Sequence, residues 1–558
     1  MTIRYSVALL CLLALPVAAA EWAEPIEAAA EEASITKALD SIERGNLEKH
    51  LNYLASDELQ GRMSGEPGYD AAAKYVAEQL AAVGVEPAGL FGGWFQDVPL
   101  LRRQIDVDGA AITVHTDRGD AGLRWKDDFT MGGDQVRDET TVRAEVVYAG
   151  FGVHAPELGY SDYDGVNVKG KIVAIFGGAP ASFPHNERAY YSSGRTKRDL
   201  MVERGAVGYI YMRSRSDQQR RSWDVVTLNA GVTAGMSWKN LQGEVADHHH
   251  QLEGSALVNE AVAPDIFAPS PISFEQALDA AEAGRPASQP LGVEMTLTQK
   301  SEHTDITSPN VVGVIRGSDP ELADEYIVYT AHLDHIGVGT PVDGDAIYNG
   351  FYDNAMGVAL MIEAARAFKA MPRAPARSIL LVAVTGEERG LLGSDYFAQY
   401  PTVPAEGMIA NINLDMPLLL YPLADIIAFG AQHSTLDVPI ARAVEAEGFA
   451  LTPDPIPEEV LFIRSDQYSF VRQGVPAVFL VPGFTSTDPD INGGALFQGH
   501  LKTHYHRPSD DLSRPVDWPS ALRFARANVR IGLEIAKDKK PPRWHEGDFF
   551  GEKFSREQ

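Results

Sequence analysis

The sequence predicts an α/β fold in which a mostly parallel, mixed sheet is covered by helices on both faces. Apolar, β-branched runs predict buried strands at residues 326–330, 378–384 and 410–414, and amphipathic patterns predict helices at 356–368 and 519–536. Acidic or imidazole side chains follow each predicted strand. Because open α/β sheets bind their ligands beyond the carboxyl ends of the strands, we expect the functional site there.

The first polar cluster follows the strand at 326–330 and contains His332 and Asp334. Side chains two residues apart on an extended chain point to the same face. A carboxylate beside a histidine can accept the proton of the second ring nitrogen, which is a common arrangement at metal ligands. The neighbouring His335 is interpreted as a polar loop residue.

Further acidic positions follow along the chain. Asp353 lies in a glycine-containing turn before a predicted helix, where helix capping is the alternative explanation. The adjacent pair Glu387 and Glu388 follows the strand at 378–384, and Asp415 follows the strand at 410–414. Carboxylates converging at this density would repel one another without bound cations, so these residues predict a metal site.

The order of these motifs resembles the co-catalytic di-zinc aminopeptidase family, which includes the bacterial secreted leucyl aminopeptidases. The motifs are His-x-Asp, an Asp in an NG-x-x-DN turn, Glu-Glu, an Asp after an Asn-x-Asn-Leu strand, and Tyr-His-x-x-x-Asp, present here at residues 505–510. The segment LASDELQGR at 54–62 also resembles the start of that peptidase domain. The charged residues of 56–72 are interpreted as solvated or capping. The resemblance implies the zinc-exopeptidase, phosphorylase/hydrolase-like sandwich.

The resemblance also implies roles for individual residues. It assigns two metal ions to five ligands, with Asp353 bridging both ions: His332 and Asp415 on one, Glu388 and His506 on the other. It makes Glu387 the general base, Asp334 the partner of His332, and Tyr505 the residue that polarises the scissile carbonyl. Two imidazoles and three carboxylates suit zinc (Zn2+), and cobalt (Co2+) or manganese (Mn2+) would also fit.

The activity implied is that of an aminopeptidase that hydrolyses peptides with a free N-terminus through a metal-activated water. A glutamate carboxypeptidase-like enzyme is one alternative, and it needs a basic cluster for the substrate carboxylate, for which Arg464 is the candidate. A glutaminyl cyclase-like enzyme with one bound metal is another. A non-catalytic, receptor-like peptide-binding module is disfavoured because all five ligand positions and both glutamates are intact.

The middle of the chain differs in character and predicts an inserted, mainly β domain. Its motifs AGFG, DYDGVNVKGKIV and ERGAVGYIYM resemble the protease-associated domain of many exported peptidases, which implies a lid or wall instead of chemistry. The expected domains are a signal peptide at 1–20, an N-terminal peptidase part at 21–140, the insert at 141–290, the main metallopeptidase domain at 291–540 and a tail at 541–558. Three consecutive histidines, His248 to His250, are interpreted as a solvated loop, because neighbours on an extended strand face opposite sides.

The N-terminal residues predict export to the periplasm or the medium. Arg4, an apolar run at 7–15 and small residues at 18–20 have the order of a secretory signal peptide, and the run is too short for a membrane span. The only cysteine, Cys11, lies within it, so the mature chain is expected to lack disulfides. The net charge of -29 argues against nucleic acid as a partner. Side-chain specificity and oligomeric state stay open.

Overall fold

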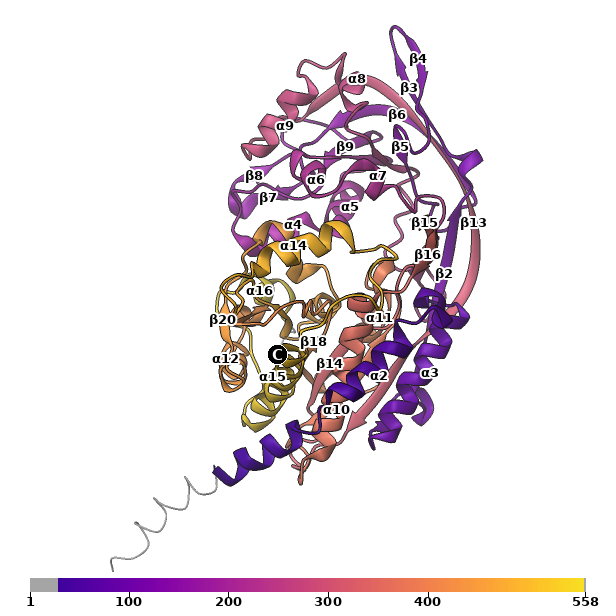
Figure 1. Cartoon of the computed structure of the whole chain (residues 1–558). Helices are drawn as coiled ribbons and strands as arrows, with labels where there is room; N and C mark the ends of the chain where they lie inside the picture. The colour runs from indigo at the N-terminus through magenta and orange to yellow at the C-terminus, as the bar shows by residue number, and fades with distance from the viewer. Residues whose placement is uncertain (1–28, 556–558) are drawn as a thin grey trace, which may run out of the picture.

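The computed structural model describes residues 29–555, which form two lobes stacked one above the other (Figure 1). The lower lobe in that view holds the main sheet, and the upper lobe holds a second sheet built from the middle of the chain. The expected signal peptide at 1–20 lies outside the described residues. Within residues 29–555, no helix is both long enough and apolar enough to span a membrane.

The main sheet is mixed and has four parallel strands at its centre. β14 (Tyr326–His332) lies between β17 (Ser378–Val384) and β18 (Met408–Asn413), and β21 (Ala477–Pro482) continues the parallel order next to β18. Every residue of these four strands is buried, as expected for parallel strands covered on both faces. The three strands predicted from apolar runs are therefore confirmed. The flanking strands are β13 (Gln289–Ile315), β2 (Phe95–Ile105) and β11 (Gly235–Trp238) beyond β17, and β19 (Asp425–Phe429) and β20 (Ala450–Thr452) beyond β21.

Helices cover both faces of the main sheet, which confirms the predicted α/β architecture. Alternate residues of β14 point to opposite faces of the sheet. Ile327 and Tyr329 pack into the core cluster on one face, and Val328 packs into the cluster on the other. The first cluster includes residues of α2 (Arg44–Leu54), α3 (Pro67–Ala82), α10 (Met356–Ala370), α12 (Asp437–Ala446) and α15 (Trp518–Lys537). The second includes residues of α11 (Leu392–Gln399) and α13 (Gln467–Val471).

The second sheet forms the upper lobe and alternates strands with helices. Its strand order is β5 (Phe129–Thr130), β12 (Ser255–Val258), β10 (Gly208–Met212), β9 (Ile172–Phe176), β6 (Glu139–Tyr148), β13, β3 (Ala111–Thr116) and β4 (Gly119–Gly122). The helices are α4 (His185–Ser192), α5 (Gly194–Glu203), α6 (Arg215–Arg220), α7 (Trp223–Val226), α8 (Ala263–Phe267) and α9 (Phe274–Glu282). β3, β4 and β5 precede residue 141, so this sheet begins earlier in the chain than the expected insert, whose boundaries stay a prediction.

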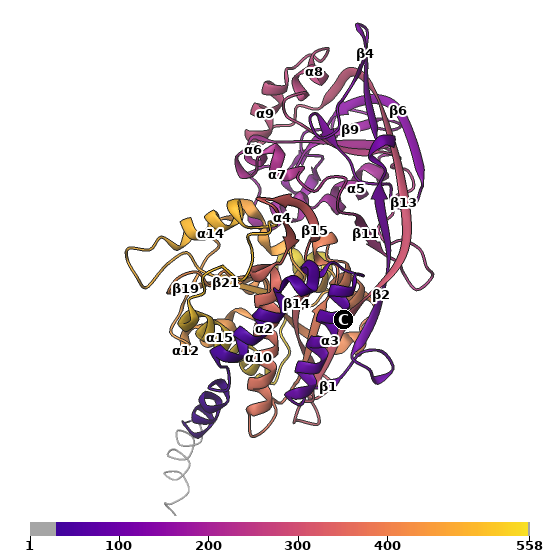
Figure 2. The same ribbon diagram turned by 45° about the vertical axis from the view of Figure 1, so that its right-hand side comes forward.

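Long strands and buried polar contacts join the two lobes. β13 pairs with β3 and β6 in the second sheet and with β2 and β17 in the main sheet, and Figure 2 shows it running along the edge of both lobes. Asp395 of α11 is 1% exposed and accepts hydrogen bonds from Arg195 of α5 at 3.2 Å and from the indole of Trp238 in β11 at 3.1 Å. The upper lobe is thus fixed against the helix that follows the Glu387–Glu388 turn.

The remaining elements are short. They are β1 (Glu86–Pro87), β7 (His154–Ala155), β8 (Tyr160–Ser161), β15 (Gly337–Val342), β16 (Asp345–Tyr348), α14 (Gly493–Thr503) and α16 (Phe549–Phe554). The tail is docked, since α16 buries Phe550 against the rings of Phe462 and Tyr468.

Candidate metal centre

The predicted site residues converge at the carboxyl ends of the central parallel strands. His332 is the last residue of β14, the Glu387–Glu388 pair follows β17 after a two-residue turn, and Asp415 follows β18. Asp353 reaches the same place from the turn before α10. These positions follow from the parallel order of β17, β14 and β18, because side chains beyond the ends of adjacent parallel strands share one edge of the sheet.

One group of three side chains could hold a metal ion. It contains His332, Asp353 and Asp415, whose nearest ligand atoms all lie within 4.8 Å of one another. The Nε2 atom of His332 lies 3.1 Å from Oδ1 of Asp415 and 3.2 Å from Oδ1 of Asp353. All three side chains are buried, and Ser465 donates a hydrogen bond to the second oxygen of Asp415 at 2.6 Å.

A second group that could hold a metal ion contains Asp353, Glu388 and His335, and His506 lies beside it. Nε2 of His506 lies 3.3 Å from Oδ2 of Asp353 and 2.9 Å from Oε2 of Glu388. Nδ1 of His335 lies 2.6 Å from Oε1 of Glu388. Asp353 therefore turns one oxygen to each group, and its Oδ2 is buried without a hydrogen-bond donor. A buried carboxylate oxygen beside two imidazoles is a suitable ligand for a cation.

His335 was interpreted as a polar loop residue, and the structure corrects this. The residue is 1% exposed, contacts Glu388 and leaves its Nε2 atom without a partner. Gly350 permits this placement, because a Cβ atom there would lie 2.6 Å from the His335 ring. The alternation of buried residues along a strand could not predict the burial of His335, because this residue follows the end of β14. Its position close to His332 in the sequence was the only available signal.

Asp334 supports the site differently from the expected arrangement. Nδ1 of His332 donates to the backbone carbonyl of Asp334 at 3.1 Å, not to its carboxylate, and this leaves Nε2 free to act as a ligand. The Asp334 carboxylate instead accepts the backbone N–H groups of Glu387 at 3.1 Å and Glu388 at 3.3 Å. Asp334 consequently holds the turn that presents both glutamates.

Two further residues fix the loops that carry the ligands. Asp510 accepts the backbone N–H groups of Tyr352 and Asp353, each at 3.1 Å to its Oδ2 atom. Arg62 is 1% exposed and donates to four backbone carbonyls, including those of Leu333 at 2.9 Å and Gly350 at 3.1 Å. The interpretation of Arg62 as a solvated or capping residue is therefore wrong, and this structural role became visible only in the folded chain.

The two neighbouring glutamates have different electrostatic surroundings. Burial and the nearby Asp353 act to raise the pKa of Glu388, but His506 and His335 outweigh them and lower it to about 2. Burial raises the pKa of Glu387 well above its ordinary value, although His332 opposes this change. Glu388 is held as an anion among imidazoles, whereas Glu387 belongs to neither metal-holding group.

A cavity of about 380 Å³ lies beside Tyr505 and is lined from both lobes. The Tyr505 ring stacks on His506 with 3.8 Å between ring centres, and the guanidinium of Arg221, after α6, lies 4.8 Å from the Tyr505 ring centre. Met416, directly after Asp415, and Arg464 line the same cavity. Near Arg464 in the chain, Asp466 is fully buried and Tyr468 packs in the core near Phe550.

Comparisons with known proteins agree with this geometry. The model of peptidase family M28 matches residues 310–532. Aminopeptidase YwaD of Bacillus subtilis (strain 168) is 33% identical over 260 residues, which cover 44% of this chain and 49% of that protein. A probable zinc metalloprotease of Pyrenophora teres f. teres (strain 0-1) is 36% identical over 106 residues, covering 19% of this chain and 22% of that protein. The matched segments thus span half or less of these relatives.

A solved structure has the same overall fold. The aminopeptidase from Aneurinibacillus sp. strain AM-1 superimposes with a TM-score of 0.52 over 90% of this chain and 96% of that chain, at 16% sequence identity. At this identity the likeness concerns the arrangement of the elements.

Proposed function

We propose that the chain, whose residues 310–532 match the model of peptidase family M28, is a zinc-dependent aminopeptidase that removes N-terminal residues from peptides. The main observation in support is that the two oxygens of one carboxylate, Asp353, face two different groups of ligands. Asp353 turns Oδ1 toward His332 and Oδ2 toward His506. A structural site would need one closed ligand set, whereas two adjoining open sets suit hydrolysis.

The residues present fit two zinc ions. His332 and Asp415 would hold one, Glu388 and His506 the other, and Asp353 both; cobalt or manganese would suit the same donors. When bound, such ions polarise the scissile carbonyl and lower the pKa of a water molecule. The buried, unpartnered Oδ2 of Asp353 supports this assignment, because it costs free energy unless a cation or a donor satisfies it.

Glu387 is proposed as the general base. It stands next to a ligand, belongs to neither ligand group, and has a raised pKa because of burial, which suits a carboxyl group that takes up a proton during the reaction. The proton taken from the attacking water would pass to the leaving amine. Asp334 positions Glu387 through its backbone N–H group. Tyr505, beside His506, is proposed to polarise the scissile carbonyl.

The substrate's free amino group is proposed to lie among the buried carboxylates of the site. Asp466 is 0% exposed, and within residues 29–555 its carboxylate oxygens accept no hydrogen bond of ordinary geometry, so a substrate ammonium would satisfy a buried carboxylate. The cavity beside Tyr505 would receive a substrate side chain. Residues of and next to α6 line this cavity, so the upper lobe, proposed to be a protease-associated domain, supplies one of its walls.

A glutamate carboxypeptidase-like activity is the second candidate, because Arg220, Arg221, Arg464 and Lys502 gather in the same cavity. Two of these cations are already engaged: Glu459 lies 3.0 Å from Arg220 and 3.1 Å from Arg464. A substrate carboxylate would have to compete with Glu459 for both arginines. This pairing favours the aminopeptidase.

The deciding experiment compares free-amino and N-acetylated amino-acid amides with a peptide ending in glutamate, and measures bound metal on the same sample. Cleavage of only the free-amino amides, with two ions per chain, supports the proposal. Release of C-terminal glutamate, or a single ion with cyclisation of N-terminal glutamine, would establish one of the alternatives. Equal cleavage of acetylated and free substrates would refute an exopeptidase that recognises the amino group.

Variants of the two glutamates test the division of roles and serve as controls for each other. Glu387→Gln should keep both ions and lose about 10²–10⁴-fold in kcat, the usual effect of removing a general base. Glu388→Gln should lower the metal content instead. A metal-depleted Glu387 variant beside a metal-replete, slow Glu388 variant would reverse the assignment.

We also propose that the protein is exported and that residues 1–20 are removed. This proposal depends on the order of Arg4, the apolar run at 7–15 and the small residues at 18–20. Mass spectrometry of the protein purified from its native envelope or medium should give an N-terminus at Glu21, and an intact Met1 would contradict the proposal.

A further inference from the structure

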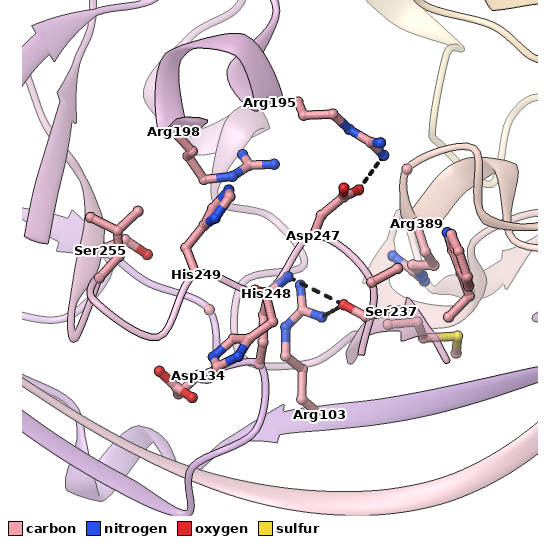
Figure 3. Close-up of a pocket in the computed structure, with 18 of the residues that line it drawn as sticks. Arg103, Asp134, Arg195, Arg198, Ser237, Asp247, His248, His249, Ser255 and Arg389 are labelled. Atoms are coloured by element: carbon pink, nitrogen blue, oxygen red, sulfur yellow. Dashed lines mark hydrogen bonds and ion pairs between the residues drawn. The ribbon is translucent and has the colours of Figure 1, made fainter. Parts of the chain in front are cut away.

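A second cavity, of about 400 Å³, lies where the upper lobe meets the turn after β17, and arginine side chains surround it (Figure 3). Arg103 comes from β2, Arg195 and Arg198 come from α5, and Arg389 follows Glu388 directly in the chain. The chain carries 77 acidic and 48 basic residues, so the four guanidinium groups here stand out against the overall negative charge of the protein.

Most of these cations have no protein anion as a partner. Arg195 pairs with Asp247 and Asp395, as the dashed line to Asp247 in Figure 3 indicates. None of the other three pairs with a carboxylate in the described part of the chain. Arg103 donates to the Ser237 hydroxyl at 2.7 Å, whereas the Arg198 head group has no hydrogen bond to any residue between 29 and 555.

Arg389 is the last of these cations, and its side chain makes few contacts with the protein. It donates one hydrogen bond to the carbonyl of Ile336, at 3.3 Å, and has no carboxylate within ion-pairing distance in the described chain. Three positively charged guanidinium groups therefore face one cavity, and some of their N–H donors make no hydrogen bond to the described chain. Such donors are costly unless water or an anion satisfies them.

The acidic groups of the lining do not neutralise these arginines. One of the two, Asp247, is already paired with Arg195. The other, Asp134, accepts the backbone N–H groups of Val136 at 3.0 Å and Arg137 at 2.8 Å. Burial lowers the pKa of Arg103; the nearby charges of Arg198 and Arg389 act in the same direction, and Tyr209 and Asp134 oppose them.

The backbone leaves room for this arrangement. Gly235 stands opposite Arg103 in the pairing of β11 with β2, and a Cβ atom at Gly235 would lie 3.0 Å from the guanidinium carbon. His248 and His249 line the cavity, and His249 lies 3.0 Å from Asp199, so these two histidines form part of a lining where a solvated loop was expected. Trp238 and Leu392 add apolar surface. A mixed lining of this volume suits a small organic molecule better than a bare ion.

We propose that this cavity is a binding site for a small organic oxyanion, whose carboxylate or phosphate groups are held by Arg103, Arg198 and Arg389. The planar guanidinium fork matches both kinds of oxyanion. A neighbouring cavity of about 440 Å³ shares Arg103 and Arg389, so a ligand longer than one charged group can be accommodated. Because the site shares the Glu388 turn but none of the proposed metal ligands, the inference does not depend on the proposed peptidase activity.

Calorimetric titration of the zinc-loaded full chain, at constant ionic strength, tests the site. The probes are inorganic phosphate, citrate, an N-acetylated Glu-Glu dipeptide and, as a neutral reference, N-acetyl-Ala-Ala amide. We expect one anion to bind per chain and the neutral peptide not to bind. Binding of phosphate or citrate identifies a free anion as the ligand class, and binding of the acidic dipeptide alone identifies an acidic peptide segment.

Two variants connect the binding to the cavity. Arg198→Gln removes a guanidinium that forms no hydrogen bond or ion pair within residues 29–555, and should weaken anion binding by about 10- to 100-fold, the effect expected for a lost charge-assisted hydrogen bond. Arg118→Gln, at an exposed arginine of the β3–β4 hairpin, is the matched control and should bind as the unaltered protein does. Arg103→Gln gives an independent second test if Arg198→Gln does not fold. Absence of binding by all three anions at millimolar concentration, or equal affinity in the cavity variants and the control, would overturn the proposal.

Discussion

Replacement of Arg62 by methionine should destabilise the whole lower lobe, although Arg62 is not among the proposed metal ligands. Its guanidinium donates to the carbonyls of Leu333 at 2.9 Å, Asn349 at 2.6 Å, Gly350 at 3.1 Å and Leu54. These carbonyls belong to the end of α2, the loop after β14 and the turn that leads to Asp353. One side chain therefore joins three separate segments around the site.

The magnitude follows from the number of acceptors left behind. Methionine fills much of the volume but donates nothing, and each buried carbonyl that loses its donor costs about 1–3 kcal/mol. Four such losses total about 4–12 kcal/mol, and entering water relieves part of this cost, so we expect a decrease of about 4 kcal/mol in the free energy of unfolding. With an unfolding entropy of about 2.1 cal/mol/K per residue, a chain of this length should lose about 4 °C in Tm.

Differential scanning calorimetry of the zinc-loaded protein measures this shift, and metal analysis after dialysis measures the effect on the site. The Arg62 variant should also retain less zinc, because both the Asp334 and Asp353 segments lose an anchor. Arg285→Met is the control, since Arg285 is exposed and makes no side-chain ion pair in the described chain, and its Tm should stay within about 1 °C. A Tm for Arg62→Met within that range, together with unchanged zinc content, would refute the reasoning.

Three further predictions concern the metal centre. Asp353→Asn should reduce the metal content at two sites, because one carboxylate serves both groups; two retained ions with full activity would show that Asp353 only caps α10. His506→Gln should lose one ion while His335→Gln keeps both, as metal analysis of the purified variants can show; the opposite result would make His335 the ligand. A chelator should abolish activity and lower the Tm. Zinc at about 1,000 times its Kd should then restore about 4 kcal/mol to the free energy of unfolding. An unchanged Tm and activity after chelation would exclude a structural or catalytic ion.

The sequence by itself determined the central sheet and the positions of the acidic residues. Apolar, β-branched runs locate strands because their pattern is local, and the strands at 326–330, 378–384 and 410–414 were found within two residues of their observed bounds. The parallel order then placed His332, the Glu387–Glu388 pair and Asp415 at one edge of the sheet.

The tertiary structure alone decided which polar side chains are buried and what they contact. Arg62 and His335 look like loop residues in the sequence, because their burial depends on segments from distant parts of the chain. The contacts of Asp334 also depend on a distant segment. Its carboxylate binds the backbone N–H group of Glu387, beyond β17, while the His332 ring donates to the Asp334 backbone carbonyl. The arginine-lined cavity joins β2, α5 and the Glu388 turn, which are far apart in sequence. A one-dimensional pattern records which residues prefer the interior, but the partners of a buried polar group are determined only when the chain closes around it.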